Sequence, residues 1–329
     1  MTQRTAQNTQ RSGRVDEFPL TLRVSGYAIP AVLSLPAAGP PIGGVLLVPG
    51  SLYSDVNGDF PAWNVFPRVY AFLAEQMAER GLAVYRFAKL GPGTGSEATD
   101  PDAAAAIRDW AGRMTIARAA HDAFRAALAE RNVAVPRLVL AGHSEGAVVV
   151  SVLARDGVDA DGIVLLAGPA VGILSVMREQ VPAMRPPEDR EAIAADLDRV
   201  IAAINAGEPI PEALKTRDGI AGLAMMPPEG HRYMRECEAT DPAAAIAAYA
   251  GPVLIVHGTA DDSVGTHHAE HLRAARGAHG TDVRLLDGLS HMFKRLPEGL
   301  SGPEAFGYAG ATDPRVAEAV AEWVWELGI

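Results

Sequence analysis

The chain has 329 residues, 48% of them hydrophobic, and a formal net charge of −11 at pH 7. A chain of this length and composition can bury a substantial core, so we expect a globular protein with one large α/β domain and room for an inserted subdomain. The acidic balance, without any cluster of lysine or arginine, argues against nucleic acid or an anionic membrane surface as a partner. The charge leaves small neutral or cationic molecules as candidate substrates.

The single cysteine, Cys237, excludes a disulfide within the chain. Its charged neighbours in the sequence predict a position on a helix surface, without a catalytic role. The first residues are polar and contain no apolar stretch, so they fit neither a secretory signal nor a membrane anchor. We therefore expect a disordered tail over residues 1–16 and a cytoplasmic protein.

From residue 18 onward, short apolar segments alternate with longer segments of helical periodicity, which is typical of a mostly parallel sheet covered by helices. Two early segments, 18–24 and 28–36, flank Gly26 and predict an antiparallel pair of strands. The later predicted strands are 45–48, 82–87, the residues leading to Ser144, 162–167, 253–258 and 283–288. The predicted helices of the domain are 66–80, one or two helices over 102–131, 268–276 and 314–327.

The pattern changes between residues 175 and 249, where charged helical stretches are broken by prolines and no strand-like segment occurs. We interpret this stretch as a helical cap inserted into the α/β domain. The domain itself then comprises residues 17–174 and 250–329.

Residues 142–146 read GHSEG, between an apolar strand-like segment and an apolar helical segment. This Gly-x-Ser-x-Gly pattern suits a very sharp strand-to-helix turn, because the positions two before and two after the serine have no room for side chains. Gly142 and Gly146 are the predicted elbow glycines, and Ser144 is the predicted nucleophile. In the alternative interpretation, Ser144 only caps a helix.

A serine hydroxyl needs a general base, and that base needs an orienting acid. On this architecture the expected order is Ser, then Asp or Glu, then His. Asp261 follows the strand 253–258 and His291 follows the strand 283–288, so both would emerge with the serine at the carboxyl edge of the sheet. We predict Asp261 as the acid, with Asp262 as the fallback, and His291 as the base. Alternatively, the aspartates only form a turn and His291 is a satisfied core histidine.

The negative charge that develops in acyl transfer needs hydrogen-bond donors. The amide of Glu145, directly after the predicted nucleophile, is one candidate, and the loop after the strand 45–48 should supply the second. We choose the amide of Ser51, with that of Leu52 as the alternative. If this loop faced away from Ser144, it would be a plain glycine turn.

Three further histidines, His267, His268 and His271, include an i, i+4 pair that could bind a metal. Without an HExxH arrangement or a nearby cysteine, a solvated helix face is the better interpretation, and no metal or organic cofactor is implied. The predicted cap also offers flexible apolar side chains that could line a pocket or pack against the sheet. These are Met177, Met184, Met225, Met226, Tyr233 and Met234.

Five segments resemble those of α/β-hydrolases: VLLVPGS, LAEQMAERGLAVYRFAKLGPGTGS, AGHSEG, PVLIVHGTADDSV and GLSHMFK. The resemblance covers the chain from about residue 17 to 329. More narrowly, the chain is similar to bacterial serine hydrolases of the esterase and acylaminoacyl-peptidase-like type, which carry a helical cap. Many relatives have His-Gly where this chain has Pro49-Gly50, and Asp-Lys-Arg-Gly where it has residues 88–91, AKLG. These departures concern the substrate side and leave the three predicted catalytic residues intact.

Together, these features predict a hydrolase that cleaves carboxylic esters of small molecules through an acyl-enzyme intermediate. Within enzymes, the runner-up is an amidase or peptidase that acts on small acylated amines or dipeptides. A third hypothesis is a non-catalytic member of the fold that binds a small ligand. A fourth is acyl transfer or C–C cleavage by the same residues.

Overall fold

The structure is a computed structural model that describes residues 10–12 and 14–328. At its centre is one mixed sheet of ten strands. The strands are β1 (Gln10–Ser12), β2 (Val15–Val24), β3 (Tyr27–Pro36), β4 (Gly43–Val48), β5 (Leu82–Phe87), β6 (Glu97–Ala98), β7 (Leu138–His143), β8 (Gly162–Leu166), β9 (Val253–Gly258) and β10 (Thr281–Leu286).

The strand order is β1-β2-β3-β5-β4-β7-β8-β9-β10, with β6 paired to β3. The first three strands are antiparallel, and β3 is also antiparallel to β5. From β5 to β10, every neighbouring pair is parallel. Parallel strands end at the same edge of a sheet, so the loops after β4, β7, β9 and β10 gather at one edge.

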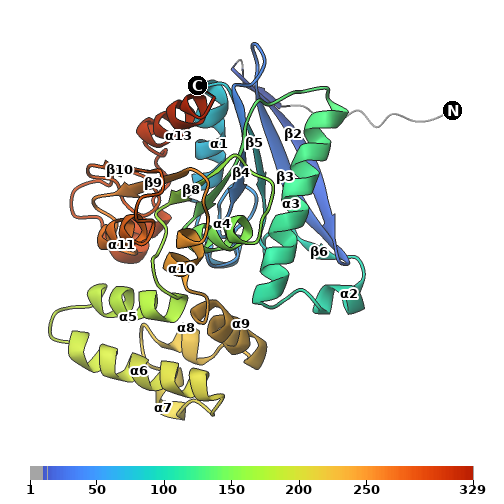
Figure 1. Ribbon diagram of the computed structural model, residues 1–329. Coiled ribbons are helices and arrows are strands. Elements are labelled where there is room, and N and C mark those ends of the chain that lie inside the picture. The colour runs from blue at the N-terminus through green and yellow to red at the C-terminus, as the bar shows by residue number, and fades with distance from the viewer. Residues whose placement is uncertain (1–9, 13, 329) are drawn as a thin grey trace.

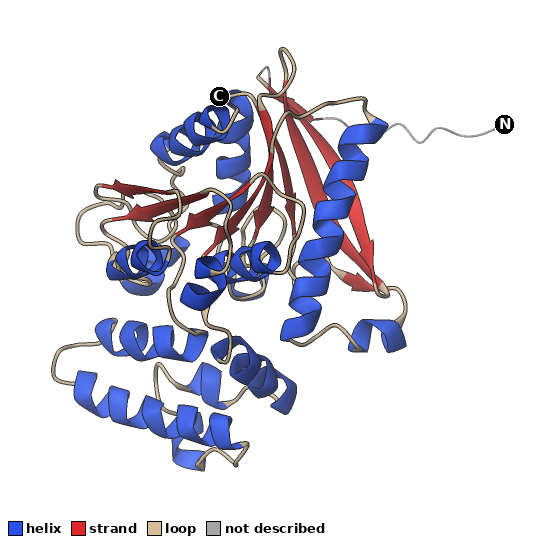
Figure 2. Ribbon diagram, viewed as in Figure 1, coloured by secondary structure: helices blue, strands red, loops and turns tan. Residues whose placement is uncertain are grey.

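Helices cover both faces of the sheet (Figure 2). One face packs against α1 (Val69–Glu79) and α13 (Pro314–Glu326). The other face packs against α3 (Trp110–Glu130), α4 (Glu145–Arg155), α10 (Pro242–Ala247) and α11 (His267–Ala275). Shorter elements are α2 (Pro101–Ala105), α12 (Gly302–Gly307) and the 3-10 helix η1 (Pro61–Trp63).

Strand β4 shows why its sequence is apolar without interruption. Val45 and Leu47 pack with α1 and α13, while Leu46 and Val48 pack on the opposite face. All four side chains are buried. Successive residues of a strand point to opposite faces, so a strand covered on both sides needs apolar residues at every position.

Between β8 and β9, the structure forms a group of helices with its own hydrophobic cluster, which includes Leu197, Ile201 and Ile220. Figure 1 shows this group below the sheet domain. Its members are α5 (Ile173–Ala183), α6 (Arg190–Ala206), α7 (Glu212–Lys215), α8 (Ala221–Ala224) and α9 (Pro228–Glu238). We call α5 to α9 the helical insertion. The next helix, α10, packs in the core of the sheet domain through Ile246.

The predicted α/β-hydrolase architecture, a mostly parallel sheet flanked by helices, is confirmed, but some boundaries differ. The predicted disorder over residues 1–16 is wrong at its end, because Gln10–Ser12 form β1 and β2 begins at Val15. Residues 1–9 and 13 lie outside the described part of the chain.

The predicted helical segment 102–131 is two helices. Asp100 accepts a hydrogen bond from the amide of Ala103 and begins α2, while Asp109 accepts one from the amide of Gly112 and begins α3. Each aspartate thus caps the free amides of its own helix. The predicted helix 66–80 begins later, at α1, after the left-handed residue Arg68.

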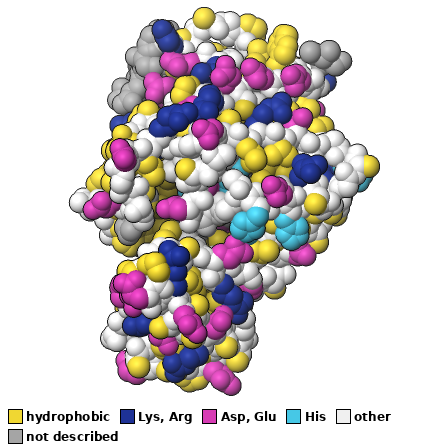
Figure 3. Space-filling model, turned by 90° about the vertical axis from the view of Figure 1, so that its left-hand side faces the viewer, with side chains coloured by type: hydrophobic (Ala, Val, Ile, Leu, Met, Phe, Trp, Pro, Cys, Tyr) yellow, Lys and Arg dark blue, Asp and Glu magenta, His cyan; other side chains and the backbone are white. Residues whose placement is uncertain are grey.

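On the face shown in Figure 3, acidic and basic side chains are interspersed. Among the residues that the structure describes, no helix combines the length and apolarity needed to cross a membrane.

Candidate active site

Ser144 occupies the sharp turn between β7 and α4, with φ 54° and ψ −123°. A β-carbon at Gly142 would lie 2.1 Å from the carbonyl oxygen of Gly146, and one at Gly146 would lie 2.3 Å from that of Val48. Neither position therefore has room for a side chain. The Ser144 hydroxyl makes no capping hydrogen bond to α4, so the side chain is not occupied by a helix-capping role.

His291 and Asp261 form a direct pair in the loops that follow β10 and β9. Nδ1 of His291 lies 2.8 Å from Oδ2 of Asp261. The other carboxylate oxygen accepts the amides of Ser263 and Val264 at 2.9 and 2.8 Å, which fixes its orientation. Asp262, the fallback acid, is exposed and makes no such contact with the imidazole.

Each partner changes the pKa of the other. Burial alone would raise the pKa of Asp261, but His291 and His257 outweigh that effect and hold it below its usual value. Burial alone would lower the pKa of His291, but the Asp261 carboxylate outweighs it and raises the pKa above 6.5. Because the pair meets at Nδ1, the proton shared with Asp261 sits there, and Nε2 of the neutral ring keeps its lone pair.

The loop that carries His291 is fastened to the turn that carries Ser144 by His143. Nε2 of His143 donates to the backbone carbonyl of His291 at 3.0 Å, and the two rings lie 4.9 Å apart between centroids. Within the described chain, the Ser144 hydroxyl itself makes no hydrogen bond to His291. The structure thus brings the three predicted residues to one edge of the sheet, with His143 as the link between the two loops.

His143 also reaches the loop after β4, through Tyr70. The Tyr70 hydroxyl accepts the amide of Gly50 at 2.7 Å and donates to Nδ1 of His143, 3.2 Å away. Burial lowers the pKa of His143 to about 3, so the ring stays neutral and each nitrogen keeps one role. We call Tyr70 and His143, with the backbone of Gly50 and His291, the neutral network. Nothing in the sequence had pointed to this role of His143.

The loop after β4 runs directly against the elbow. A β-carbon at Gly50 would lie 3.1 Å from Cβ of Ser144, so this loop does not face away from the serine. The Gly50 amide is taken by Tyr70. In the described structure, the amides of Ser51 and Leu52 have no hydrogen-bond acceptor, and Leu52 has a left-handed φ of 66°.

The side chain of Glu145 lies at the centre of a buried charged cluster that sequence reasoning missed. Its carboxylate is 2.8 Å from Nζ of Lys89 and 3.4 Å from Nε of Arg113. It also accepts the hydroxyls of Tyr233 at 2.9 Å and Ser51 at 3.2 Å. Burial opposes ionisation, but Lys89 and Arg113 outweigh it and lower the pKa of Glu145 to about 2. We call these five residues the Glu145 cluster.

A cavity of about 330 Å³ opens beside His291. Most of its walls come from the loop after β4 and the segment after β10, with a smaller contribution from α5. Its residues include Leu52, Phe60, Trp63, Met292 and Phe306 from the sheet domain, with Gln180 and Met184 from the helical insertion. Among the six apolar cap residues singled out from the sequence, only Met184 lines this cavity.

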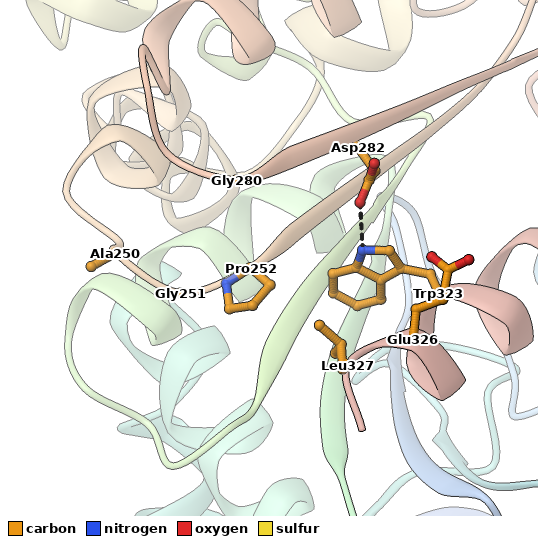
Figure 4. A pocket seen from close by; sticks show the side chains of 8 residues that line it. All are labelled: Ala250, Gly251, Pro252, Gly280, Asp282, Trp323, Glu326 and Leu327. Atoms are coloured by element: carbon orange, nitrogen blue, oxygen red, sulfur yellow. Dashed lines mark hydrogen bonds between the residues drawn. The ribbon is translucent and has the colours of Figure 1, made fainter. Parts of the chain in front are cut away.

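A second cavity, of about 310 Å³, lies at the opposite edge of the sheet (Figure 4). Gly251 and Gly280 in its wall precede β9 and β10, so it opens at the amino ends of these strands. Asp282 accepts the indole N–H of Trp323 at 3.1 Å, which satisfies both groups. Because it opens at the amino ends of the strands, the cavity lies away from the sheet edge that carries Ser144 and from the loops at that edge.

Glu179, His267 and His268 place three potential metal ligands within 4.8 Å of one another. However, Nδ1 of His268 accepts the amide of Ala170, so its proton is on Nε2, which faces Glu179 at 3.2 Å. A metal needs the lone pair that this proton occupies, so the geometry fits a contact between α5 and α11 rather than a metal.

Two sequence predictions about burial are wrong. His268 is 2% exposed rather than part of a solvated helix face, because α5 covers it. Cys237 is 1% exposed rather than on a helix surface, because its side of α9 faces the sheet domain's core. Burial raises the pKa of the Cys237 thiol well above its usual value, which keeps it protonated and unreactive.

A family model described as the Alpha/beta hydrolase family matches residues 45–299. This match spans well over half of the chain, so the protein belongs to the α/β-hydrolase family. No curated protein matches its sequence.

Solved structures of the same fold include Est1E and an esterase domain. Est1E from Butyrivibrio proteoclasticus with ferulic acid bound has a TM-score of 0.54 and 18% identity, over 94% of this chain and 98% of that one. The esterase domain of a Rhodothermus marinus protein has a TM-score of 0.54 and 16% identity, over 95% and 98% of the two chains.

A puromycin-hydrolyzing peptidase from Mycobacterium tuberculosis has a TM-score of 0.52 and 16% identity, over 94% of this chain but 39% of its own. At such identities, these structures establish the shared fold alone. The chain is a hydrolase by family.

Proposed function

We propose that this protein is a serine esterase that cleaves carboxylic esters of small molecules with Ser144, His291 and Asp261. The observation that carries the proposal is the 2.8 Å pair between His291 and Asp261, held at the same sheet edge as the strained turn of Ser144. A neutral imidazole with its proton directed to a carboxylate is the form of histidine that can act as a general base.

In the proposed reaction, Nε2 of His291 takes the hydroxyl proton of Ser144 as the Ser144 oxygen attacks the ester carbonyl. The tetrahedral intermediate collapses, the C–O bond to the alcohol breaks, and His291 returns the proton to that oxygen. A water molecule then gives a proton to His291 and attacks the acyl-enzyme. The acid leaves, and Ser144 recovers its proton from His291.

The amides of Ser51 and Glu145 are the proposed donors to the negative oxygen of the intermediate. The tight approach of Gly50 to Ser144 supports the first, since it sets the loop after β4 beside the nucleophile. The use of the Gly50 amide by Tyr70 leaves the following amides as the available donors of this loop.

We propose esters with a bulky apolar or aromatic group as the substrate class. The cavity beside His291 has aromatic walls, with the rings of Phe60 and Phe306 5.0 Å apart. Trp63 closes another side and stacks on Tyr53 at 6.1 Å with an angle of 5°. The binding of ferulic acid, an aromatic acid, by the similarly folded Est1E agrees with this proposal.

The primary test is covalent labelling by a fluorophosphonate, read as intact mass, with Ser144→Ala as the control. We expect one label on the wild type and none on the variant, followed by faster turnover of nitrophenyl esters than of aminoacyl anilides. A folded wild type that takes no label would overturn the proposal. Preferred cleavage of the anilides would replace the esterase by an amidase or peptidase.

Substrate class is tested by Trp63→Ala, with Phe66→Ala as the matched control. Both side chains are exposed by nearly half, but only Trp63 lines the cavity. We expect Trp63→Ala to lower kcat/KM for naphthyl esters roughly tenfold, with little change for acetate esters of small alcohols. Equal effects of the two substitutions would contradict the assignment of this cavity to the substrate.

A further inference from the structure

The Glu145 cluster joins four distant parts of the chain around one carboxylate. Ser51 follows β4, Lys89 follows β5, Arg113 lies on α3 and Tyr233 lies on α9 of the helical insertion. The reaction proposed above uses the backbone amide of Glu145 but makes no use of these side chains. A buried ionic cluster costs desolvation energy, so its presence around the residue that follows the proposed nucleophile calls for an explanation.

The cluster carries a surplus positive charge. Lys89 and Arg113 are both cationic, and Glu145 is the only carboxylate within salt-bridge distance of either in the described structure. Burial keeps Tyr233 protonated, so it adds no charge. The side chains of Lys89, Arg113 and Glu145 are 10%, 5% and 4% exposed, so solvent screens this surplus charge poorly.

The same cluster holds the loop that supplies the proposed oxyanion donor. The Arg113 guanidinium donates to the backbone carbonyl of Pro49 as well as contacting Glu145. The hydroxyl of Ser51 donates to the other oxygen of Glu145 at 3.2 Å. The two residues whose amides are the proposed donors, Ser51 and Glu145, therefore have their side chains bonded to each other within the cluster.

We propose that Lys89, together with Arg113, is a positioning residue for the oxyanion site: it fixes the carboxylate that holds Ser51 and sets one surplus positive charge beside the atom that becomes negative. This inference rests on the proposed esterase function. Fixed charge placed where negative charge develops lowers the barrier most in a dry, poorly screened site.

The proposal has a pH signature. Burial lowers the pKa of Lys89 to about 8, although Glu145 opposes this shift and Arg113 adds to it. The titratable groups that face Lys89 are Glu145, Arg113, Tyr233 and Cys237. Burial keeps Tyr233 and Cys237 protonated, and Glu145 is ionised above about pH 2. Lys89 is then the member that loses its charge near pH 8, and the cluster becomes neutral above it.

The experiment measures kcat for one neutral ester from about pH 6 to 9.5 in the wild type, Lys89→Met and Lys89→Arg. For the wild type we expect kcat to fall as pH rises through about 8. For Lys89→Arg, which stays charged, that fall should disappear while kcat at pH 7 is largely kept. For Lys89→Met we expect kcat at pH 7 to drop roughly tenfold and the alkaline fall to vanish.

Lys294→Met is the matched control, because Lys294 is the other lysine whose pKa burial lowers to about 8 and it lies outside the cluster. Three results would each overturn the inference. The first is a wild-type kcat that stays flat to pH 9.5, and the second is an alkaline fall that persists in Lys89→Arg. The third is an alkaline fall that Lys294→Met alone removes. If Lys89→Met does not fold, the wild-type and Lys89→Arg profiles still decide. Failure of the esterase itself is distinct, because the wild type would then take no fluorophosphonate label.

Discussion

The two residues that flank Ser144 in the sequence lie in opposite electrostatic surroundings. His143 belongs to the neutral network, in which the Tyr70 hydroxyl and the backbone carbonyl of His291 satisfy its two ring nitrogens without any charge. Glu145 belongs to a cluster of three buried charges. Both networks nevertheless hold the same short loop after β4, one through the amide of Gly50 and the other through Pro49 and Ser51.

Uncharged and charged contacts thus hold the same loop, but the two kinds of contact differ in how much stability is lost when one partner is removed. A neutral hydrogen bond contributes little net energy but is costly to leave half-made. A buried ion pair is much more costly to break, because the remaining charge has lost its partner. The two sides of Ser144 should therefore respond differently to substitution and to pH.

The largest expected effect is on the charged side. Glu145→Ala leaves Lys89 and Arg113 buried without their carboxylate, so we expect the free energy of unfolding to fall by about 3–5 kcal/mol in urea titrations. The control is Glu298→Ala, at an exposed position, which should change it by less than about 0.5 kcal/mol. A loss below about 1 kcal/mol for Glu145→Ala would show that the cluster contributes no more than a surface pair.

Acidification should weaken the neutral side before the charged side. The pKa of His143 is about 3 in the folded protein against an ordinary value of 6.5, so the unfolded chain binds more protons below pH 6.5 and stability is lost as pH falls. The matching loss from Glu145 begins only below its ordinary value of 4.5. From pH 6.5 to 4.5, we expect His143 to account for about 2 kcal/mol of lost stability.

The measurement is the difference in unfolding free energy between the wild type and His143→Gln at several pH values. His291, whose raised pKa acts with the opposite sign, is present in both proteins and largely cancels in the difference. A difference that does not change between pH 6.5 and 4.5 would show that His143 is not held neutral.

The smallest of these effects is expected for Tyr70→Phe, which removes one hydroxyl and leaves the Gly50 amide without its acceptor. We expect about 1 kcal/mol of lost stability, together with a lower kcat because the loop after β4 loses one of the two networks that hold it. Tyr85→Phe is the matched control, since Tyr85 is equally buried but its hydroxyl has no hydrogen-bond partner in the described chain. Equal losses for the two variants would reduce the role of Tyr70 to packing.

Apart from β1 and β6, the strands could be predicted, as could the turn at Ser144 and the order of Ser144, Asp261 and His291, because their signals are local. A doubly covered strand such as β4 must be apolar throughout, and the turn at Ser144 must have glycines two residues away on each side. Asp261 and His291 come directly after strands, and a parallel sheet brings such positions to one edge whatever the intervening chain does.

The Glu145 cluster and the buried positions of His268 and Cys237 were decided by the tertiary structure. In the sequence, Lys89, Arg113 and Tyr233 share no motif, and nothing distinguishes them from ordinary surface residues. Lys89 and Arg113 are buried because the fold brings the loop after β5, α3 and α9 together around Glu145. Periodicity reports which face of a helix is apolar, but not which distant charge it meets, and Coulomb energy depends on that distance and on the exclusion of water.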